Sequence, residues 1–272
     1  MANITIENVS MKFELDDSEV TALTGINLKL NDGDFVSIIG PSGCGKSTLI
    51  DIIAGLKKPS QGKVLVENKE VTKPGSDFGI VFQDYSLFPW MSAYENLYFA
   101  IEHTNKKLSK EEIKRKSKKY LDTVGLSKFA DKFPRTLSGG MRQRLAIARM
   151  FAIKPKAFLM DEPFGALDAL NKVYMQDLLV YLWTRGDKRE TTLYVTHDVD
   201  EALFFSDRIV VMTPSPGRIK EIINVDFPRP RCRVDIAKSA EYMSLRSKLI
   251  SLLHDEMLES IAEQEKHLRD LK

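Results

Sequence analysis

The chain has few cysteines and little net charge, and both features restrict its function. Its 272 residues include only two cysteines, Cys44 and Cys232, which lie far apart in the sequence. Neither a disulfide framework nor a cysteine metal cluster is therefore indicated, and a reducing cytosol is the expected compartment. The 40 Lys and Arg residues nearly balance the 38 Asp and Glu residues, so the charge predicts neither nucleic acid nor an acidic membrane surface as the main partner.

Long apolar runs are also missing. No run approaches the roughly 20 residues that a membrane span needs, and the first residues lack a basic stretch followed by an apolar one. We therefore expect a chain with neither a signal peptide nor a transmembrane segment. A hydrophobic share of 43% is enough to build a sizeable core.

The most informative stretch is a glycine-rich sequence that follows the apolar run at residues 35–39. It fits the phosphate-loop pattern G-x-x-x-x-G-K-[ST], in which glycines let backbone N–H groups surround phosphate oxygens and the next helix directs its positive end toward them. An ordinary strand-to-helix turn is the alternative, but the flanking strand and helix favour nucleotide binding. The predicted phosphate-binding residues are Gly40, Pro41, Ser42, Gly43, Cys44, Gly45, Lys46, Ser47 and Thr48.

Within this loop two residues have specific expected roles. Lys46 reaches the β- and γ-phosphates, and the Ser47 hydroxyl binds Mg²⁺.

Alternating and apolar runs predict further strands, separated by helical segments. Strands are expected at 4–9, 22–30, 35–39, 63–67, 79–82, 157–160, 192–196 and 209–212, and helices near 49–54, 92–101, 109–124, 138–149 and 178–183. Gln83, Asp161 and His197 each follow a predicted strand. Because ligands bind at the carboxyl ends of parallel strands in an α/β sheet, these residues can converge with the phosphate loop.

Two adjacent acids follow the strand at residues 157–160. Asp161, at the tip of a buried strand, suits a Mg²⁺ ligand, and Glu162 suits a base that orients and deprotonates a water. The alternative is an exposed acidic turn. For His197 the alternatives are a γ-phosphate sensor, which we favour, and a structural histidine.

Three other segments allow two interpretations each. Ser138 is a good helix N-cap, and the bare amides after it, at Gly139 and Gly140, can bind an anion. Phe13 can stack on an adenine or pack in a core. The lysine-rich segment 109–124 is interpreted as a solvated helix face rather than a nucleic-acid patch.

Taken together, these residues resemble the ATP-binding-cassette (ABC) ATPases over residues 4–222. The sequences of residues 82–91 and 137–144 are most similar to those of the ATPase subunits of nitrate, sulfonate and taurine-type importers. Met141 departs from the pattern, because many relatives have Gln there, but no loss of function is expected. The matching features are the phosphate loop, Gln83, Leu137-Ser138-Gly139-Gly140, Asp161-Glu162, Asp168 and His197.

The resemblance implies an α/β fold of the P-loop NTPase type, with a RecA-like core. An N-terminal antiparallel β subdomain and an inserted α-helical signature subdomain, at about 84–152, are expected within an ABC ATPase domain at 1–227. Residues 228–272 are expected to form a basic linker and a short helical C-terminal extension. We expect this extension to pack on the cassette or its partner rather than to form a substrate-sensing module.

The resemblance also implies a mechanism. Two copies pair head to tail, so that Ser138, Gly139 and Gly140 of one chain cap the ATP held by the other, and Asp168 lies in the loop that crosses the interface. Glu162, His197, Lys46 and Gln83 form the catalytic set. Ser47, Gln83 and Asp161 bind Mg²⁺, and Phe13 stacks on the adenine.

The implied partners are a second ATPase subunit, a membrane permease and a separate extracytoplasmic solute-binding protein, with no nucleic acid. The chain would lie peripherally on the cytoplasmic face of the membrane and drive uptake of a small solute, an anion of the nitrate, sulfonate or taurine type. Leu87, Phe88 and Trp90 are candidates for docking the permease, with burial inside the helical subdomain as the alternative.

The sequence opposes two alternative functions. One is a soluble ABC-type ATPase that acts on nucleic acid or ribosomes, which the lack of an inserted heptad arm or a second cassette opposes. The other is a structural nucleotide-binding protein without turnover, which Glu162 and His197 oppose.

Overall fold

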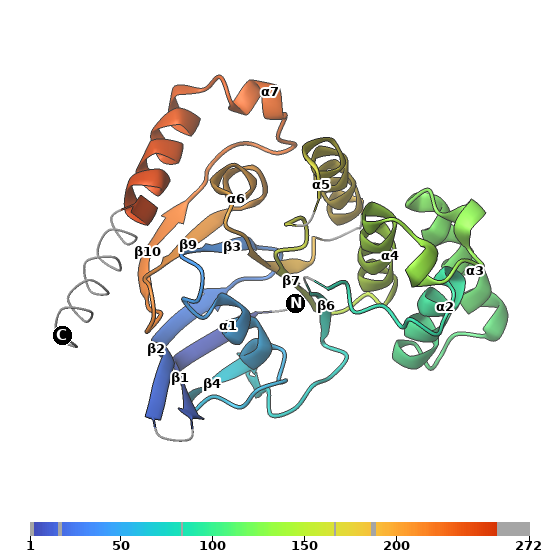
Figure 1. Cartoon of the computed structure of the whole chain (residues 1–272), viewed down its shortest axis with the longest axis horizontal. Helices are drawn as coiled ribbons and strands as arrows, with labels where there is room; N and C mark the ends of the chain where they lie inside the picture. The colour runs from blue at the N-terminus through green and yellow to red at the C-terminus, as the bar shows by residue number, and fades with distance from the viewer. Residues whose placement is uncertain (1–2, 16–17, 83, 166, 186–188, 255–272) are drawn as a thin grey trace, which may run out of the picture. The chain divides into compact units, whose positions relative to one another are not determined.

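The computed structural model describes residues 3–15, 18–82, 84–165, 167–185 and 189–254 (Figure 1). The chain divides into two compact units, one formed by Met1–Pro74 with Thr191–Lys272 and the other by Gly75–Glu190. Each unit is described separately.

The first unit contains an antiparallel sheet in the order β2-β1-β4-β5 and a second set of strands in the order β10-β9-β3-β8. A helix at residues 240–254, here named the C-terminal helix, follows the other elements of this unit. These elements are β1 (Ile4–Leu15), β2 (Ser18–Leu30), β3 (Phe35–Ile39), α1 (Lys46–Ile53), β4 (Gln61–Val66), β5 (Lys69–Glu70), β8 (Thr191–Val195), α6 (Val199–Phe205), β9 (Arg208–Met212), β10 (Ile219–Asn224) and α7 (Arg233–Ile236).

Strand β3 lies at the centre of the first unit, which explains why it is apolar except for Ser37. All five of its residues are buried, and it pairs in parallel with both β8 and β9. Strands buried on both faces are apolar throughout rather than alternating. Because Ile38 is in register with Val195, the carboxyl ends of β3 and β8 meet at one edge.

The N-terminal hairpin is longer than the sequence pattern predicts. Strand β1 continues to Leu15, and Phe13 pairs with Val20 of β2, so the segment between the two predicted strands is itself part of the hairpin. Shifts of register along β1 interrupt the alternation of side chains on which the prediction relied. Strand β10 has no counterpart among the predicted strands.

The second unit consists of helices and a parallel pair of strands, in which Val81 of β6 is in register with Met160 of β7. Helices α2 and α3 both begin with a capping box, from Ser92 with Glu95 and from Ser109 with Glu112, as their sequences favour. The elements are β6 (Phe78–Val81), α2 (Ala93–Thr104), α3 (Lys110–Thr123), the 3₁₀ turns η1 (Ser127–Phe129) and η2 (Pro134–Thr136), α4 (Gly139–Ala152), β7 (Ala157–Asp161) and α5 (Ala169–Thr184).

The segment expected to form a basic linker makes extensive contacts in the first unit. The side chain of Arg231 is only 2% exposed and donates hydrogen bonds to the carbonyls of Leu203, Ser206 and Val225. Arg229 pairs with Asp207 at 2.8 Å. These arginines therefore fix the chain against the end of α6 instead of leaving it solvated.

Among the described residues, no helix combines the length and the apolar character that crossing a membrane requires. The predicted α/β class is confirmed, with its antiparallel N-terminal sheet, inserted helical region and helical C-terminal extension.

Candidate functional site

The phosphate loop connects β3 to α1 in the first unit. The helix N-cap is Gly45, with φ of 93°, and neither a capping side chain nor an acidic residue occupies the first turn of the helix. The positive end of α1 is therefore well suited to an anion. Lys46 is buried, and its Nζ donates to the carbonyl oxygens of Gly40 and Pro41, each at 2.8 Å.

Three glycines allow close packing around this loop. A Cβ at Gly45 would lie 2.6 Å from Cδ2 of Leu23, and Gly45 has a positive φ that L-residues rarely adopt. A Cβ at Gly217 would lie 2.0 Å from the carbonyl oxygen of Cys44, and one at Gly40 3.0 Å from Cys44 Sγ. Gly217 was not among the predicted site residues.

Cys44 belongs to the wall of the loop rather than to its surface. Its side chain is buried, and burial raises the pKa of the thiol above its usual value despite the nearby Lys46 ammonium. Since the thiolate is the reactive form, Cys44 is expected to react slowly.

His197 follows β8 and is exposed, at the same edge as the phosphate loop. The segment around it is held by a buried carboxylate, because Glu201 Oε2 accepts hydrogen bonds from Tyr194 Oη at 2.9 Å and Thr196 Oγ1 at 2.6 Å. Thr196 Oγ1 in turn accepts from the backbone N–H of Asp198 at 3.0 Å. Glu201 was also missed at the sequence level, where nothing distinguishes it from a surface glutamate at a helix start.

Phe13 lies in β1 and is half-buried. The Lys57 ammonium lies 5.3 Å from the centre of its ring, a cation–π distance. Its partner Val20 lies two residues before Ala22, whose carbonyl oxygen would be 3.0 Å from a Cβ at Gly45. The hairpin that carries Phe13 thus approaches the phosphate loop through β2.

In the second unit, Asp161 is the last residue of β7 and Glu162 follows it; both are partly buried. Glu162 has a φ of 44°, in the left-handed region that costs free energy for a residue other than glycine. A residue strained in this way is held in place by its surroundings. Gln83, predicted to follow the neighbouring strand, lies outside the described residues.

Ser138, Gly139 and Gly140, here named the signature residues, form the start of α4. The Ser138 hydroxyl caps the helix by accepting from the backbone N–H of Met141 at 3.3 Å, which confirms the predicted N-cap. A Cβ at Gly139 would lie 4.0 Å from Tyr85 Oη, and one at Gly140 3.9 Å from Asn171 Oδ1. The side chains of Tyr85, in the loop after Gln83, and of Asn171, at the start of α5, are therefore the nearest neighbours of these two glycines.

Asp168 is the N-cap of α5. Its carboxylate accepts from the backbone N–H of Asn171 at 3.1 Å and from the Asn171 side-chain amide at 2.6 Å, and these hydrogen bonds hold the pKa of Asp168 below its ordinary value. Asn171 was not predicted, yet it holds the Asp168 carboxylate, and its Oδ1 lies 3.9 Å from the position that a Cβ at Gly140 would take.

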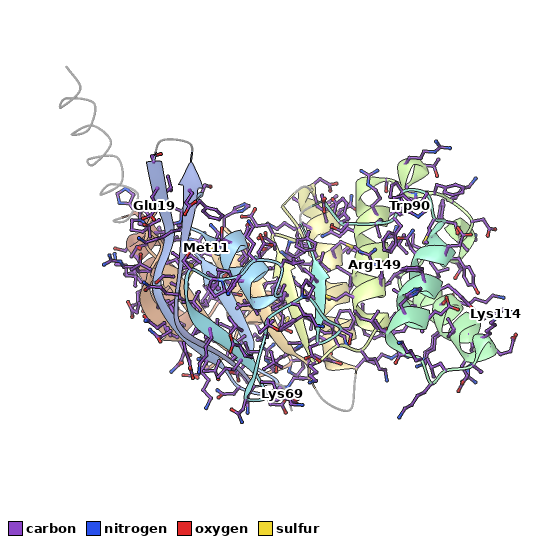
Figure 2. All side chains as sticks on the ribbon, turned by 90° about the horizontal axis from the view of Figure 1, so that it is seen from below. Met11, Glu19, Lys69, Trp90, Lys114 and Arg149 are labelled. Carbon is purple, nitrogen blue, oxygen red and sulfur yellow. The ribbon has the colours of Figure 1, made fainter. Side chains whose placement is uncertain are left out.

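The apolar loop at residues 87–91 is held rigidly while one large side chain projects from it. Asn96 is fully buried and exchanges hydrogen bonds with the backbone of Phe88, at 2.9 and 3.2 Å, and donates to Met91 O at 3.0 Å. Trp90 is 69% exposed and lies at the surface of this unit in Figure 2. The loop is therefore preformed, whereas Leu87 and Phe88 are partly buried.

A cavity of about 440 Å³ lies beside this loop and is lined by Phe88, Phe99, His103 and Arg149, among others. Arg149 donates to the carbonyl oxygens of Ser86 at 2.7 Å and Tyr85 at 3.3 Å, and its burial lowers its pKa. Arg149, a residue of α4, therefore holds the backbone at Tyr85 and Ser86 by hydrogen bonds. Helix α4 is the helix that Ser138 caps.

Among the residues that the structure describes, no group of three or more His, Cys, Asp or Glu side chains could hold a metal ion. The predicted Mg²⁺ ligands are of another kind: the hydroxyl of Ser47, the amide oxygen of Gln83, which lies outside the described residues, and the carboxylate of Asp161. This hard-oxygen set fits Mg²⁺, which is usually held by one or two protein oxygens together with substrate phosphates and water.

The chain is similar to several known proteins. A family model described as ABC transporter matches residues 23–165. The uncharacterized ABC transporter ATP-binding protein MJ0412 of Methanocaldococcus jannaschii is 46% identical over 95% of this chain and 94% of that protein. The bicarbonate transport ATP-binding protein CmpD of Synechococcus elongatus is 44% identical over 93% of this chain and 90% of that protein.

Solved structures are similar as well. The ATP-binding cassette MJ0796, in a dimeric post-hydrolysis state bound to ADP and Pi, superimposes with a TM-score of 0.72. It is 33% identical and covers 83% of this chain and 100% of its own.

Proposed function

This chain belongs to the ABC transporter family of ATP-binding proteins, and we propose that it is the ATP-hydrolysing subunit of an importer for a small anion. It binds ATP and is an ATPase of the P-loop NTPase fold, as its relatives and structural neighbours are ATP-binding cassettes. The solute class is supported by the similarity to the bicarbonate transport protein CmpD. It also agrees with the likeness to nitrate, sulfonate and taurine-type subunits.

The observation that carries the enzymatic role is the meeting of two strand ends in the first unit. The phosphate loop follows β3 and His197 follows β8, and these strands are parallel and in register. Lys46, which now donates to two loop carbonyls, would turn its ammonium to the β- and γ-phosphates. His197 would donate to the γ-phosphate, and Phe13 would stack on the adenine.

Hydrolysis requires a base for the attacking water, and Glu162 takes this role in the proposal. Ser47, Gln83 and Asp161 would hold Mg²⁺, which would neutralise charge on the phosphate oxygens when bound. Lys46 and His197 stabilise charge that develops on the γ-phosphate in the transition state. The strained backbone of Glu162 supports this role, because strained conformations are typical of residues whose orientation serves function.

The active form is a head-to-tail dimer, in which Ser138, Gly139 and Gly140 of one copy close over the ATP of the other. Support comes from the dimeric state of the similar cassette MJ0796 and from the uncovered first turn of α4, where Ser138 is exposed. Asp168, fixed by Asn171, would lie in the loop that crosses between copies.

The chain would act at the cytoplasmic face of a membrane on a separate permease, with a separate solute-binding protein delivering the anion. Leu87, Phe88 and Trp90 are the proposed contact for the permease. The exposed Trp90 on a backbone fixed by Asn96 supports this role, because a preformed aromatic anchor loses little conformational freedom on binding.

The enzymatic proposal is tested with Glu162→Gln. We expect ATP binding to persist, hydrolysis to fall by about 10²-fold or more because the base is lost, and an ATP-bound dimer to accumulate in size-exclusion chromatography. Near-normal turnover in this variant would remove Glu162 from its role.

The docking proposal is tested with Trp90→Ala, because loss of a central aromatic anchor typically costs 2 kcal/mol or more of binding, about 30-fold in affinity. Soluble ATPase activity should stay unchanged while association with the permease weakens. Lys114→Ala, at an exposed residue of α3 in the same unit, is the control. Unchanged assembly, or association with ribosomes or DNA instead of a permease, would contradict the proposal.

A further inference from the structure

The C-terminal helix (residues 240–254) packs on the helix that follows the candidate histidine. Its buried residues Tyr242 and Leu249 belong to a hydrophobic cluster that also contains Leu203 of α6 and Ile39, the last residue of β3. One apolar cluster therefore joins the start of the phosphate loop, the helix after the histidine and the end of the described chain.

Two polar side chains of the C-terminal helix converge on a single carboxylate of α6. The Tyr242 hydroxyl donates to Asp200 Oδ1 at 2.6 Å, and Arg246 donates to the same oxygen at 2.7 Å and to Oδ2 at 3.3 Å. Burial, together with the hydrogen bond to Asp200, raises the pKa of Tyr242. The phenol therefore keeps its proton and stays a donor at neutral pH.

Asp200 lies in the first turn of α6, three residues after His197. Asp198, the N-cap, accepts with Oδ1 from the backbone N–H groups of Asp200 at 2.9 Å and Glu201 at 3.1 Å. Helix α6 has only seven residues, and a helix this short is unstable without tertiary contacts. The geometry of its first turn therefore depends on the contacts of Asp200 with the C-terminal helix and on the buried hydrogen bonds of Glu201.

We propose that Tyr242 and Arg246 are positioning residues for ATP hydrolysis, which hold the first turn of α6, and through it His197, in one orientation. This depends on the transition-state role proposed above for His197. The C-terminal helix is then part of the catalytic support rather than an appendage. Displacement of a catalytic group by about 1 Å can cost up to roughly 100-fold in rate.

The contacts can be removed one at a time in the full-length chain. Tyr242→Phe deletes the hydroxyl and keeps the buried ring, and Arg246→Ala deletes the guanidinium, whose side chain is 40% exposed. Lys248→Ala is the matched control, because Lys248 lies on the same helix and pairs with Glu221 of β10 instead of with α6.

Two readouts separate positioning from general packing. Steady-state ATP hydrolysis gives kcat and KM, and NMR of ¹³C-labelled histidine reports the environment of His197 directly. The chain has four histidines, so the spectrum is simple, and His197→Gln identifies the signal. We expect the double variant Tyr242→Phe/Arg246→Ala to lose about 3- to 10-fold in kcat with KM for ATP within about twofold, as for a contact that acts in the transition state.

The same double variant should move the His197 resonance, whereas Lys248→Ala should change neither readout. An unchanged kcat, a lowered kcat with an unmoved His197 resonance, or an equal effect of Lys248→Ala would each overturn the proposal. Normal turnover in His197→Gln itself would refute the role of the histidine and the proposal with it. An inactive His197→Gln beside a fully active double variant would refute the positioning role alone.

Discussion

Replacing Gly217 with alanine would place a methyl group 2.0 Å from the carbonyl oxygen of Cys44 and 2.9 Å from Cε of Met212. The methionine can rotate away, but the Cys44 carbonyl belongs to the backbone of the phosphate loop. Either this loop or the connection between β9 and β10 that carries residue 217 must therefore move.

Neither movement is free. Residue 217 is fixed from both sides, since its N–H donates to Ala22 O at 2.9 Å and its carbonyl accepts from Thr24 N at 3.0 Å. Withdrawing it breaks both hydrogen bonds, at about 1 kcal/mol each and about 2 kcal/mol together. If the phosphate loop moves instead, a similar free-energy cost weakens ATP binding. A loss of about 2 kcal/mol corresponds to a Kd raised roughly 30-fold.

The assay measures both outcomes on one preparation, with ATP affinity from titration of a fluorescent nucleotide and Tm from calorimetry. We expect Gly217→Ala to weaken nucleotide binding about 30-fold, or to lower Tm by about 4–8 °C, or to divide the strain between the two. Gly75→Ala is the control, because a Cβ at Gly75 would meet no atom within 4 Å. If Gly217→Ala binds nucleotide and melts like the parent chain, the close approach of Gly217 to the loop is refuted.

Two further predictions concern the buried groups Glu201 and Cys44. Glu201→Ala should lower the free energy of unfolding in urea by about 2 kcal/mol or more, because the hydroxyls of Tyr194 and Thr196 lose a buried acceptor. Glu201→Gln keeps an acceptor oxygen and should cost less. Equal losses in the two variants would contradict this account. Iodoacetamide should label the exposed Cys232 well before the buried Cys44, whose raised pKa lowers its thiolate fraction at neutral pH, and the Cys44 rate should rise as the pH rises; equal rates in mass spectrometry would show that the loop opens.

The sequence determined the class of fold and the family because these depend on local signals. The phosphate-loop spacing, the apolar run of β3 and the capping residue Ser138 each act over a few neighbouring residues, and each has the predicted structure. The predicted roles of Asp161, Glu162 and His197 follow from their position after strands, which also can be inferred locally.

Tertiary structure alone decided which distant residues support these groups. Gly217 lies next to Cys44, and the C-terminal helix brings Tyr242 and Arg246 to Asp200, across separations that no periodic pattern encodes. The segment predicted to be a basic linker is packed instead, because Arg231 donates hydrogen bonds to buried carbonyls at the end of α6. Local propensity specifies strands, caps and turns, whereas hydrogen-bond partners across the chain exist only after the backbone has folded and brought them within reach.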